Sequence, residues 1–296
     1  MTYSIVARDA ATGRFGIAVQ SHAFTVGPIV PWAEAGVGAI ATQAFVNVSF
    51  GPIGLEMLRN GWSAKRVVAA LVAGDDQSEQ RQIGVIDAQG GVAAYSGSAC
   101  IPAFGHILGD GFTVQGNLLE RDDVWRSMAP AYEAASSAGQ PFSERLLVAL
   151  EAAEAAGGDV RGRQSAAILI AEGALQPATW RGRLMDLRVE DHHDPVPELR
   201  RLVNLWEAQA LLDDEGDAAK AGMDEAERYA EARRRAPEFA ELAFWAGVEL
   251  ANRGEIDAGR RELAVAFAAD VRWRTTLKHM AGGRVERTLA EKLLAD

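Results

Sequence analysis

The chain has 296 residues, of which 48% are hydrophobic, and its formal net charge is −11. This length allows one large domain or two ordinary ones, and the hydrophobic content can fill a core of native size, which excludes a disordered chain. The acidic balance argues against nucleic acid as the main partner, because phosphate binding needs clustered Lys and Arg side chains.

The single cysteine, Cys100, excludes a disulfide within the chain, which is typical of a reducing compartment. No apolar run approaches the ~20 residues that a membrane-spanning helix needs. The N-terminus has neither the basic segment nor the apolar segment of a signal peptide. We therefore expect a cytoplasmic protein without membrane contact.

Up to about residue 191, the sequence consists of short β-type runs separated by glycine-containing turns. The expected strands cover residues 3–8, 15–19, 36–45, 111–119, 162–173 and 185–191, and a further hairpin is centred on Gln89-Gly90-Gly91. The expected helices begin near residue 51, restart at Ser63 as an N-cap, and cover residues 124–138 and 142–156.

This order contains hairpins and paired helices instead of the βαβ alternation of a parallel sheet. It predicts an α+β fold in which antiparallel sheets are covered by helix pairs. The favoured arrangement is a four-layer α-β-β-α sandwich over residues 1–195.

Residues 196–296 have a helical pattern throughout, with apolar residues at i, i+3 and i+4 spacing. We therefore predict a second, all-α domain that begins after Pro195. Two of its helices, joined by Arg253-Gly254-Glu255, are similar to a tetratricopeptide-type hairpin. Only about one and a half such units fit into this length, whereas a stacked array needs ~3 to be stable alone. We therefore expect this domain to pack against the first domain or against a second subunit.

Residues 2 to about 196 resemble the bacterial family known as domain of unknown function 1028 (DUF1028), which is assigned to the N-terminal-nucleophile (Ntn) hydrolase superfamily. Seven segments carry the resemblance, in order along the chain. They are TYSIVARD, GVGAIATQAFVN, GPIGLEMLRNGWSA, RQIGVIDAQGGVAAYSG, QGNLL, GGDVRGRQSAA and DLRVEDHHDPVPEL. The superfamily fold is an α-β-β-α sandwich, in agreement with the layers expected from the pattern.

The resemblance implies a mechanism that centres on the second residue. Superfamily members attack an amide carbonyl with an N-terminal Thr, Ser or Cys, and the α-amino group of the same residue acts as the base. An α-amine has a pKa near ~8, so much of it can accept a proton at neutral pH. Thr2 would become the N-terminus once an aminopeptidase removes Met1. The alternative is that Thr2 is only a β-branched residue suited to a strand.

The sequence departs from proteasome-like members of the superfamily, which place a lysine on the third strand to assist the nucleophile. The corresponding segment, GVGAIATQAF, has none, and the first lysine of the chain, Lys65, falls in a helix. Catalysis would then depend on the amine alone, or on Ser21, Thr42 or Gln43 as helpers.

Acyl transfer also needs hydrogen-bond donors for the oxyanion. Asn117 and Asn47 are the candidate side chains, and Gly116 could supply a backbone N–H, although Gly-Asn pairs also form turns. Ser21 and His22 end the second strand, and hairpin pairing would bring them near Thr2.

Arg163 and Gln164 precede a buried strand and complete the expected substrate-binding set of Gln43, Asn47, His22, Arg163 and Gln164. Arg163 could bind an acidic group of the substrate, because a guanidinium group binds a carboxylate through two parallel hydrogen bonds. The alternative, which we favour, is an ion pair with Asp159 or Asp186.

Three other site types receive less support. His192, His193 and Asp194 contain metal-ligand types, but adjacent strand residues point to opposite faces and no metal-binding motif surrounds them. Cys100, with His106 nearby in sequence, is a weak candidate nucleophile, since free cysteines are usually buried. The glycine-rich stretches match no nucleotide-binding motif, so we expect no cofactor.

We predict an Ntn amidohydrolase that cleaves a C–N bond of a small molecule or peptide through an acyl-enzyme on Thr2. The alternatives are a non-catalytic binding or scaffold protein whose helical tail docks a partner, and a metal-assisted hydrolase using His192, His193 and Asp194. The apolar tail and the glycine-rich strands also predict a homodimer.

Overall fold

The computed structural model describes residues 2–213 and 222–295. The chain divides into two compact units, Met1–Arg200 and Arg201–Asp296. The division falls inside helix α5 (Pro195–Ala210), so the first turns of this helix belong to the N-terminal unit. Arg200 donates hydrogen bonds to Glu144 and Glu151 of the preceding helix, at 2.6 and 2.5 Å, which ties the start of α5 to that unit.

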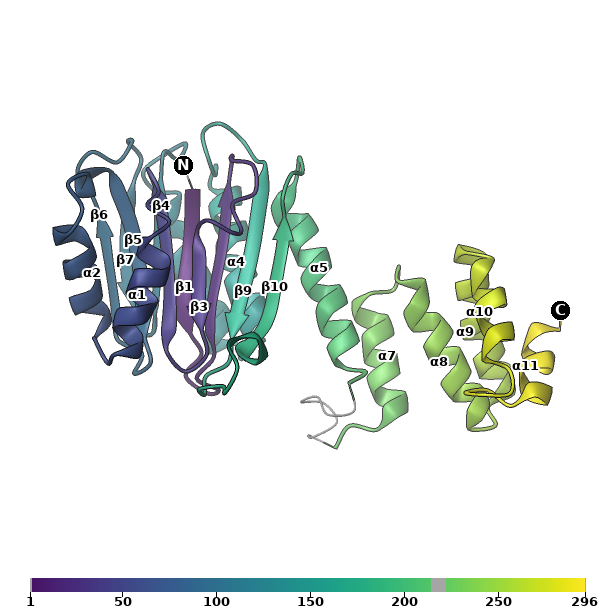
Figure 1. The fold of residues 1–296 in the computed structure, drawn as a ribbon. Helices are drawn as coiled ribbons and strands as arrows, with labels where there is room; N and C mark the ends of the chain where they lie inside the picture. The colour runs from purple at the N-terminus through teal and green to yellow at the C-terminus, as the bar shows by residue number, and fades with distance from the viewer. Residues whose placement is uncertain (1, 214–221, 296) are drawn as a thin grey trace. The chain divides into compact units, whose positions relative to one another are not determined.

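Two antiparallel sheets form the frame of the N-terminal unit (Figure 1). The larger sheet has the strand order β10-β9-β2-β1-β8-β7, and the smaller sheet has the order β3-β4-β5-β6. The strands are β1 (Thr2–Arg8), β2 (Phe15–Ser21), β3 (Pro31–Glu34), β4 (Gly38–Ala44), β5 (Arg81–Asp87), β6 (Val92–Ser96), β7 (Gly105–Gly109), β8 (Phe112–Asn117), β9 (Ser165–Ala171) and β10 (Arg183–Val189). The mixed α+β class with antiparallel sheets, predicted from the hairpin pattern, is confirmed.

Two strands, β3 and β7, were missing from the predicted set, and each lies at the edge of its sheet. β3 begins with Pro31, and β7 has a glycine at each end. Both residue types are depleted in strands, and proline is tolerated there mainly at edges, so the local sequence carries a weak strand signal. The expected helix over 124–138 begins as a 3₁₀ turn and becomes α-helical at Met128.

Helix pairs pack against both sheets, as Figure 1 shows for α1, α2 and α4. The helices of this unit are α1 (Phe50–Arg59), α2 (Ala64–Ala73), α3 (Met128–Ser137) and α4 (Phe142–Ala155). α1 and α2 pack against the smaller sheet, and α3 and α4 pack against the larger one. A separate apolar cluster fills the space between the sheets, with Val6 and Ile17 from one sheet and Ala39 and Ile86 from the other.

The C-terminal unit is entirely helical over the residues that the structure describes. Its helices after α5 are α7 (Glu225–Arg235), α8 (Ala240–Asn252), α9 (Ile256–Ala269), α10 (Arg272–Met280) and α11 (Arg287–Leu294). α8 and α9 form the predicted helical hairpin, and Gly254 makes its turn with a φ of 90°. Across residues 2–213 and 222–295, no helix combines the length and the apolar character that crossing a membrane would require.

The close packing of α8 on α9 predicts that replacing a helical glycine by alanine will destabilise the protein, although this change usually stabilises a helix. A Cβ atom at Gly259 would lie 2.7 Å from the carbonyl oxygen of Gly247, so backbone would have to move. Alanine normally gains about 1 kcal/mol over glycine inside a helix. Here overpacking should outweigh that gain, and Gly259→Ala should lower the free energy of unfolding by about 1–2 kcal/mol, measured by chemical denaturation.

Gly283→Ala is the matched control in the same unit, because the nearest atom to its added Cβ would be 3.7 Å away. Its effect should stay within about 0.5 kcal/mol. Equal stabilities of the two variants would contradict the close packing of α8 on α9.

Candidate functional site

Thr2 lies at the start of β1, which is a central strand of the larger sheet. It is paired with Asn117 at the end of β8, and its side chain is only 4% exposed. Side chains alternate along a strand, so Thr2 faces the same way as Val6, toward the smaller sheet. Its hydroxyl Oγ1 donates to the Ser21 hydroxyl at the end of β2, at 3.2 Å. The structure therefore brings Thr2, Ser21 and Asn117 together between the sheets.

Buried amide side chains surround the backbone of Thr2. Gln43 Nε2 and Asn117 Nδ2 both donate to the Thr2 carbonyl oxygen, at 3.3 and 3.4 Å. The same two amide groups donate to Gln82 Oε1, at 2.7 and 2.9 Å. We call Ser4, Gln43, Gln82, Gln115 and Asn117 the amide cluster. All of its side chains are neutral, and each is at most 1% exposed.

Gln82 is the member of this cluster that connects the two sheets most directly. It belongs to β5 of the smaller sheet, and its Nε2 donates to the carbonyl oxygens of Gly116 and Gly105 in the larger sheet, at 2.8 and 3.1 Å. Sequence reasoning missed Gln82 and Gln115. The available signal was a polar residue within an otherwise apolar buried strand, since buried polar groups are retained where they find partners.

Two residues with strained backbones come directly after members of the amide cluster. Ala44 follows Gln43 with a φ of 69°, and Leu118 follows Asn117 with a φ of 49°. Non-glycine residues rarely adopt positive φ, and such strain concentrates at functional sites. Both residues lie at the end of the unit where Thr2 begins β1.

A cavity of about 90 Å³ opens at this end of the sheets. It is lined by Ala44, Phe45, Ile101 and Asn117. Asn117 thus borders the cavity and also contacts the Thr2 carbonyl. The arrangement provides a hydroxyl, a neutral amide donor and an adjacent apolar hollow, which suits attack on an uncharged carbonyl compound.

Sequence comparison assigns this architecture to a family. The profile described as "Family of unknown function (DUF1028)" matches residues 2–199. The chain belongs to the DUF1028 family. A DUF1028 crystal structure from Silicibacter pomeroyi is 31% identical, with a TM-score of 0.61, and the match covers 74% of this chain and 92% of that one. Comparison with curated proteins finds no match.

Arg163 of this DUF1028 protein is engaged in ion pairs, but not with the expected partners. It binds Glu154 of α4, and its Nη1 lies 2.5 Å from Asp194. The predicted partners are occupied elsewhere: Asp159 binds Arg161, and Asp186 binds arginines of its own strand. These partners were predicted wrongly because the fold places the loop before β9, which carries Arg163, beside the end of α4 and beside Asp194, and local sequence patterns do not show that proximity.

Glu154 also accepts a hydrogen bond from the Tyr3 hydroxyl, on the face of the larger sheet opposite to the amide cluster. Burial raises the pKa of Glu154, against the lowering effects of the Tyr3 hydrogen bond and the Arg163 charge. Burial likewise raises the pKa of Tyr3 well above its usual value. Tyr3, which follows Thr2 in sequence, and its partner Glu154 are therefore separated from the Thr2 side chain by the sheet.

The remaining predicted binding residues organise loops of the DUF1028 fold. His22 Nδ1 lies 3.2 Å from the Arg163 carbonyl oxygen, and Gln164 donates to Asp191 at 3.1 Å. Asn47 accepts from the backbone N–H of Ser49 at 3.2 Å. The Thr42 hydroxyl donates to the Asn47 carbonyl, also at 3.2 Å. These hydrogen bonds stay within the loops and do not reach Thr2.

The structure gives little support to the two alternative chemistries, which are a metal site at His192, His193 and Asp194 and a nucleophile at Cys100. His192 and His193 stack with ring centres 4.3 Å apart, and no group of three metal-ligating side chains occurs among residues 2–213 and 222–295. The buried Cys100 thiol donates to the Arg81 carbonyl at 3.4 Å, and burial raises its pKa, which disfavours the thiolate. His106 instead contacts the Ser96 hydroxyl, at 2.9 Å.

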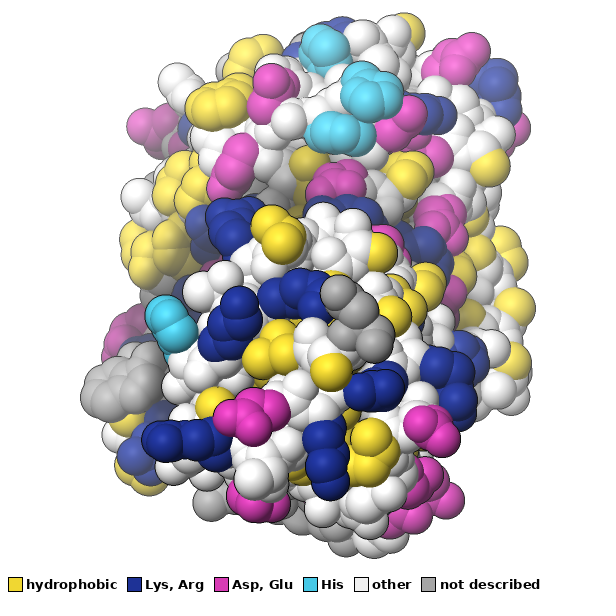
Figure 2. Space-filling view, turned by 90° about the vertical axis from the view of Figure 1, so that its right-hand side faces the viewer, with side chains coloured by type: hydrophobic (Ala, Val, Ile, Leu, Met, Phe, Trp, Pro, Cys, Tyr) yellow, Lys and Arg dark blue, Asp and Glu magenta, His cyan; other side chains and the backbone are white. Residues whose placement is uncertain are grey.

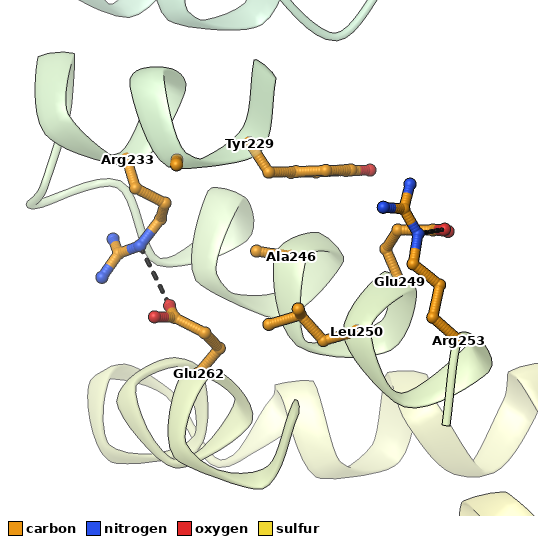
Figure 3. Close-up of a pocket in the computed structure, with 8 residues that line it drawn as sticks. Tyr229, Arg233, Ala246, Glu249, Leu250, Arg253 and Glu262 are labelled. Atoms are coloured by element: carbon orange, nitrogen blue, oxygen red, sulfur yellow. Dashed lines mark hydrogen bonds and ion pairs between the residues drawn. The ribbon is translucent and has the colours of Figure 1, made fainter. Parts of the chain in front are cut away.

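A larger cavity of about 310 Å³ lies within the C-terminal unit (Figure 3). Tyr229 and Leu250 contribute apolar surface, while Arg233 pairs with Glu262 at 3.1 Å and Arg253 with Glu249 at 2.8 Å. Lys and Arg side chains, with apolar ones between them, also spread over the face of this unit drawn in Figure 2. This cavity is in the size range of ligand sites, which begins near ~300 Å³.

The amide cluster predicts a large cost for removing Gln82. Gln82→Leu keeps the side chain buried but removes the short bonds from Gln43 and Asn117, which keep only their longer contacts, and it removes the donor to two carbonyl oxygens of the larger sheet. Each unsatisfied buried donor costs about 1–3 kcal/mol. The free energy of unfolding from chemical denaturation should fall by about 2–4 kcal/mol. The exposed Gln89→Leu is the control, with a change under about 0.5 kcal/mol; a comparable loss there would exclude the cluster as the cause.

Proposed function

We propose that this DUF1028 protein is an N-terminal-nucleophile amidohydrolase and that its first unit is an α-β-β-α sandwich of the Ntn type. The helix pairs packed against both sheets support the fold. The observation that carries the function is the placement of Thr2, at the first position of a central strand, with its hydroxyl between the sheets and with its strand partner Asn117 bordering a cavity.

In the proposed reaction, Met1 is first removed, so that Thr2 carries the free α-amine. The Thr2 hydroxyl oxygen attacks the amide carbonyl carbon, and its proton passes to the α-amine. The C–N bond then breaks, and the same proton moves to the departing amine. Water attacks the resulting ester by the same route, which releases a carboxylic acid and restores the hydroxyl.

The neutral surroundings of Thr2 favour its amine as the base. A carboxylate nearby would hold the amine protonated, whereas burial among neutral groups lowers the pKa of an amine from ~8. The amide cluster is neutral, and the acidic Glu154 lies on the other face of the sheet. The buried Asp159, which accepts from the His22 N–H next to Ser21, has its charge balanced by Arg161. This environment compensates for the absence of a lysine on β4.

Asn117 is the proposed donor to the oxyanion. Its bond to the Thr2 carbonyl is long, at 3.4 Å, while its bond to Gln82 is short, at 2.9 Å. The longer bond costs little to redirect toward a substrate oxygen. Gly116 is paired with Tyr3 on one side and with Gly105 on the other, so its backbone is less accessible for this role.

Thr2→Ala tests this function. With Met1 removed, hydrolysis of simple acyl anilides should fall at least ~10³-fold, because the nucleophile is lost. Thr2→Ser should retain activity and accumulate an acyl-enzyme visible by intact mass. Undiminished turnover by Thr2→Ala, or an active protein that still carries Met1, would refute the mechanism.

A second candidate function is supported by the cavity of the C-terminal unit. We propose that it binds an extended segment of a partner protein, whose apolar side chain contacts Tyr229 and Leu250 between the two Arg–Glu pairs.

Leu250→Arg tests this candidate because the longer, charged side chain should fill the cavity. On a peptide array, the full chain should bind selected peptides, Leu250→Arg should lose at least tenfold in affinity, and Thr2→Ala should bind them unchanged. Equal binding by the wild type and Leu250→Arg would exclude the cavity as a docking site.

A further inference from the structure

The cavity that Asn117 borders restricts which amide can reach the site. We propose that it is an acyl subsite that accepts a short, uncharged aliphatic acyl group, with Ala44, Phe45, Ile101 and Asn117 as its walls. The assignment to the acyl side rests on the proposed function, whereas the preference for an aliphatic group rests on the cavity itself.

The lining of the acyl subsite is apolar except for one neutral amide. Three of its walls, Ala44, Phe45 and Ile101, offer hydrocarbon, and the fourth is the Asn117 side chain. The nearby cation Arg81 is paired with Asp75, with Nε 2.7 Å from the carboxylate, and its Nη1 donates to the Phe45 carbonyl. A charged acyl group would lose its hydration without gaining a free counter-charge, so it is disfavoured.

The volume of the acyl subsite limits the length of the chain. An engineered apolar cavity of ~150 Å³ holds benzene, which has six non-hydrogen atoms. By proportion, about 90 Å³ holds about four such atoms. This corresponds to the carbon chain of a butyryl or isobutyryl group, and a six-carbon chain would extend into solvent.

The walls are held in place before any ligand binds. The backbone N–H of Phe45 donates to the Gln80 carbonyl, and that of Leu118 donates to the Ile101 carbonyl, each at 3.2 Å. Ala44, the last residue of β4, has a strained φ of 69° directly before Phe45. Phe45 remains 51% exposed, and Val46 and Val48 beside it are 37% and 42% exposed. An apolar rim on a fixed loop is typical of a binding surface.

The acyl side is favoured over the amine side for a chemical reason. Asn117 borders the cavity and is also the proposed oxyanion donor, so the group bonded to the carbonyl carbon lies next to it. The acyl group stays attached to Thr2 through the intermediate, while the amine must leave to solvent. A cavity in this position therefore suits the part that remains.

Ligand binding tests the acyl subsite without requiring turnover. The full chain is titrated with acetamide, butyramide and hexanamide, and dissociation constants are measured by NMR. Burying two additional CH₂ groups should make butyramide bind about 15-fold more tightly than acetamide, with no further gain for hexanamide. Ile101→Phe should abolish the advantage of butyramide, and Ile101→Ala should shift the preference to hexanamide.

Leu108→Phe is the matched control, since Leu108 is 51% exposed on β7 and lines no part of the cavity. Equal affinity for acetamide and butyramide, or the same preference in Ile101→Phe as in the wild type, would overturn the subsite. In turnover, N-ethylbutyramide should exceed its isomer N-butylacetamide, which also has an alkylamine leaving group, and the reverse order would overturn the acyl assignment. A butyramide preference without Thr2-dependent turnover would support the aliphatic site while refuting the hydrolase.

Discussion

The N-terminal unit depends on satisfying amide side chains that are buried between two sheets. Gln82 reaches from the smaller sheet to two carbonyl oxygens of the larger one, and Gln43 reaches from the smaller sheet to the Thr2 carbonyl. An unpaired amide in this position would cost about 1–3 kcal/mol, so the spacing of the sheets and the register of β5 against β6 and β4 must agree with these contacts. The start of β1 is held by the same hydrogen bonds.

This constraint also determines the electrostatics around Thr2. Amides satisfy one another without net charge, so the amide cluster places no charge next to Thr2. The charged groups of this region are paired: Glu154 with Arg163 across the larger sheet, Asp159 with Arg161 beside His22, and Asp75 with Arg81 beside the loop that carries Phe45. A site of this kind suits a neutral amine as a base and an uncharged substrate, and both proposals depend on that feature.

Local patterns were sufficient to predict most of the secondary structure. The hairpin at Gln89-Gly90-Gly91 joins β5 to β6, with Gly90 at a φ of 85°, and Ser63 caps α2 by accepting from the Arg66 N–H. Both signals depend on neighbouring residues only, which is why the sequence shows them. The edge strands β3 and β7 were missed because their pairing comes from the rest of the sheet and not from their own composition.

The candidate site was only partly predictable, for the same reason. Thr2, Ser21, Gln43 and Asn117 could be named from strand ends and from the family resemblance. Gln82 and Gln115 could not, because their importance depends on which strand of one sheet faces which strand of the other. The partners of Arg163 were predicted wrongly because Glu154 approaches it through the packing of α4 against the sheet.

The sequence by itself determined the α+β class, the helical C-terminal segment, the membership of DUF1028 over residues 2–199 and the position of Thr2 at the first strand. These properties follow from residue order, periodicity and capping, which are local. Only the tertiary structure decided that Thr2 is surrounded by neutral amides, that Asn117 borders a small apolar cavity, and that the nearby charges are already paired. Those properties arise where residues distant in the chain pack against each other. Burial and hydrogen bonding then determine which side chains become partners.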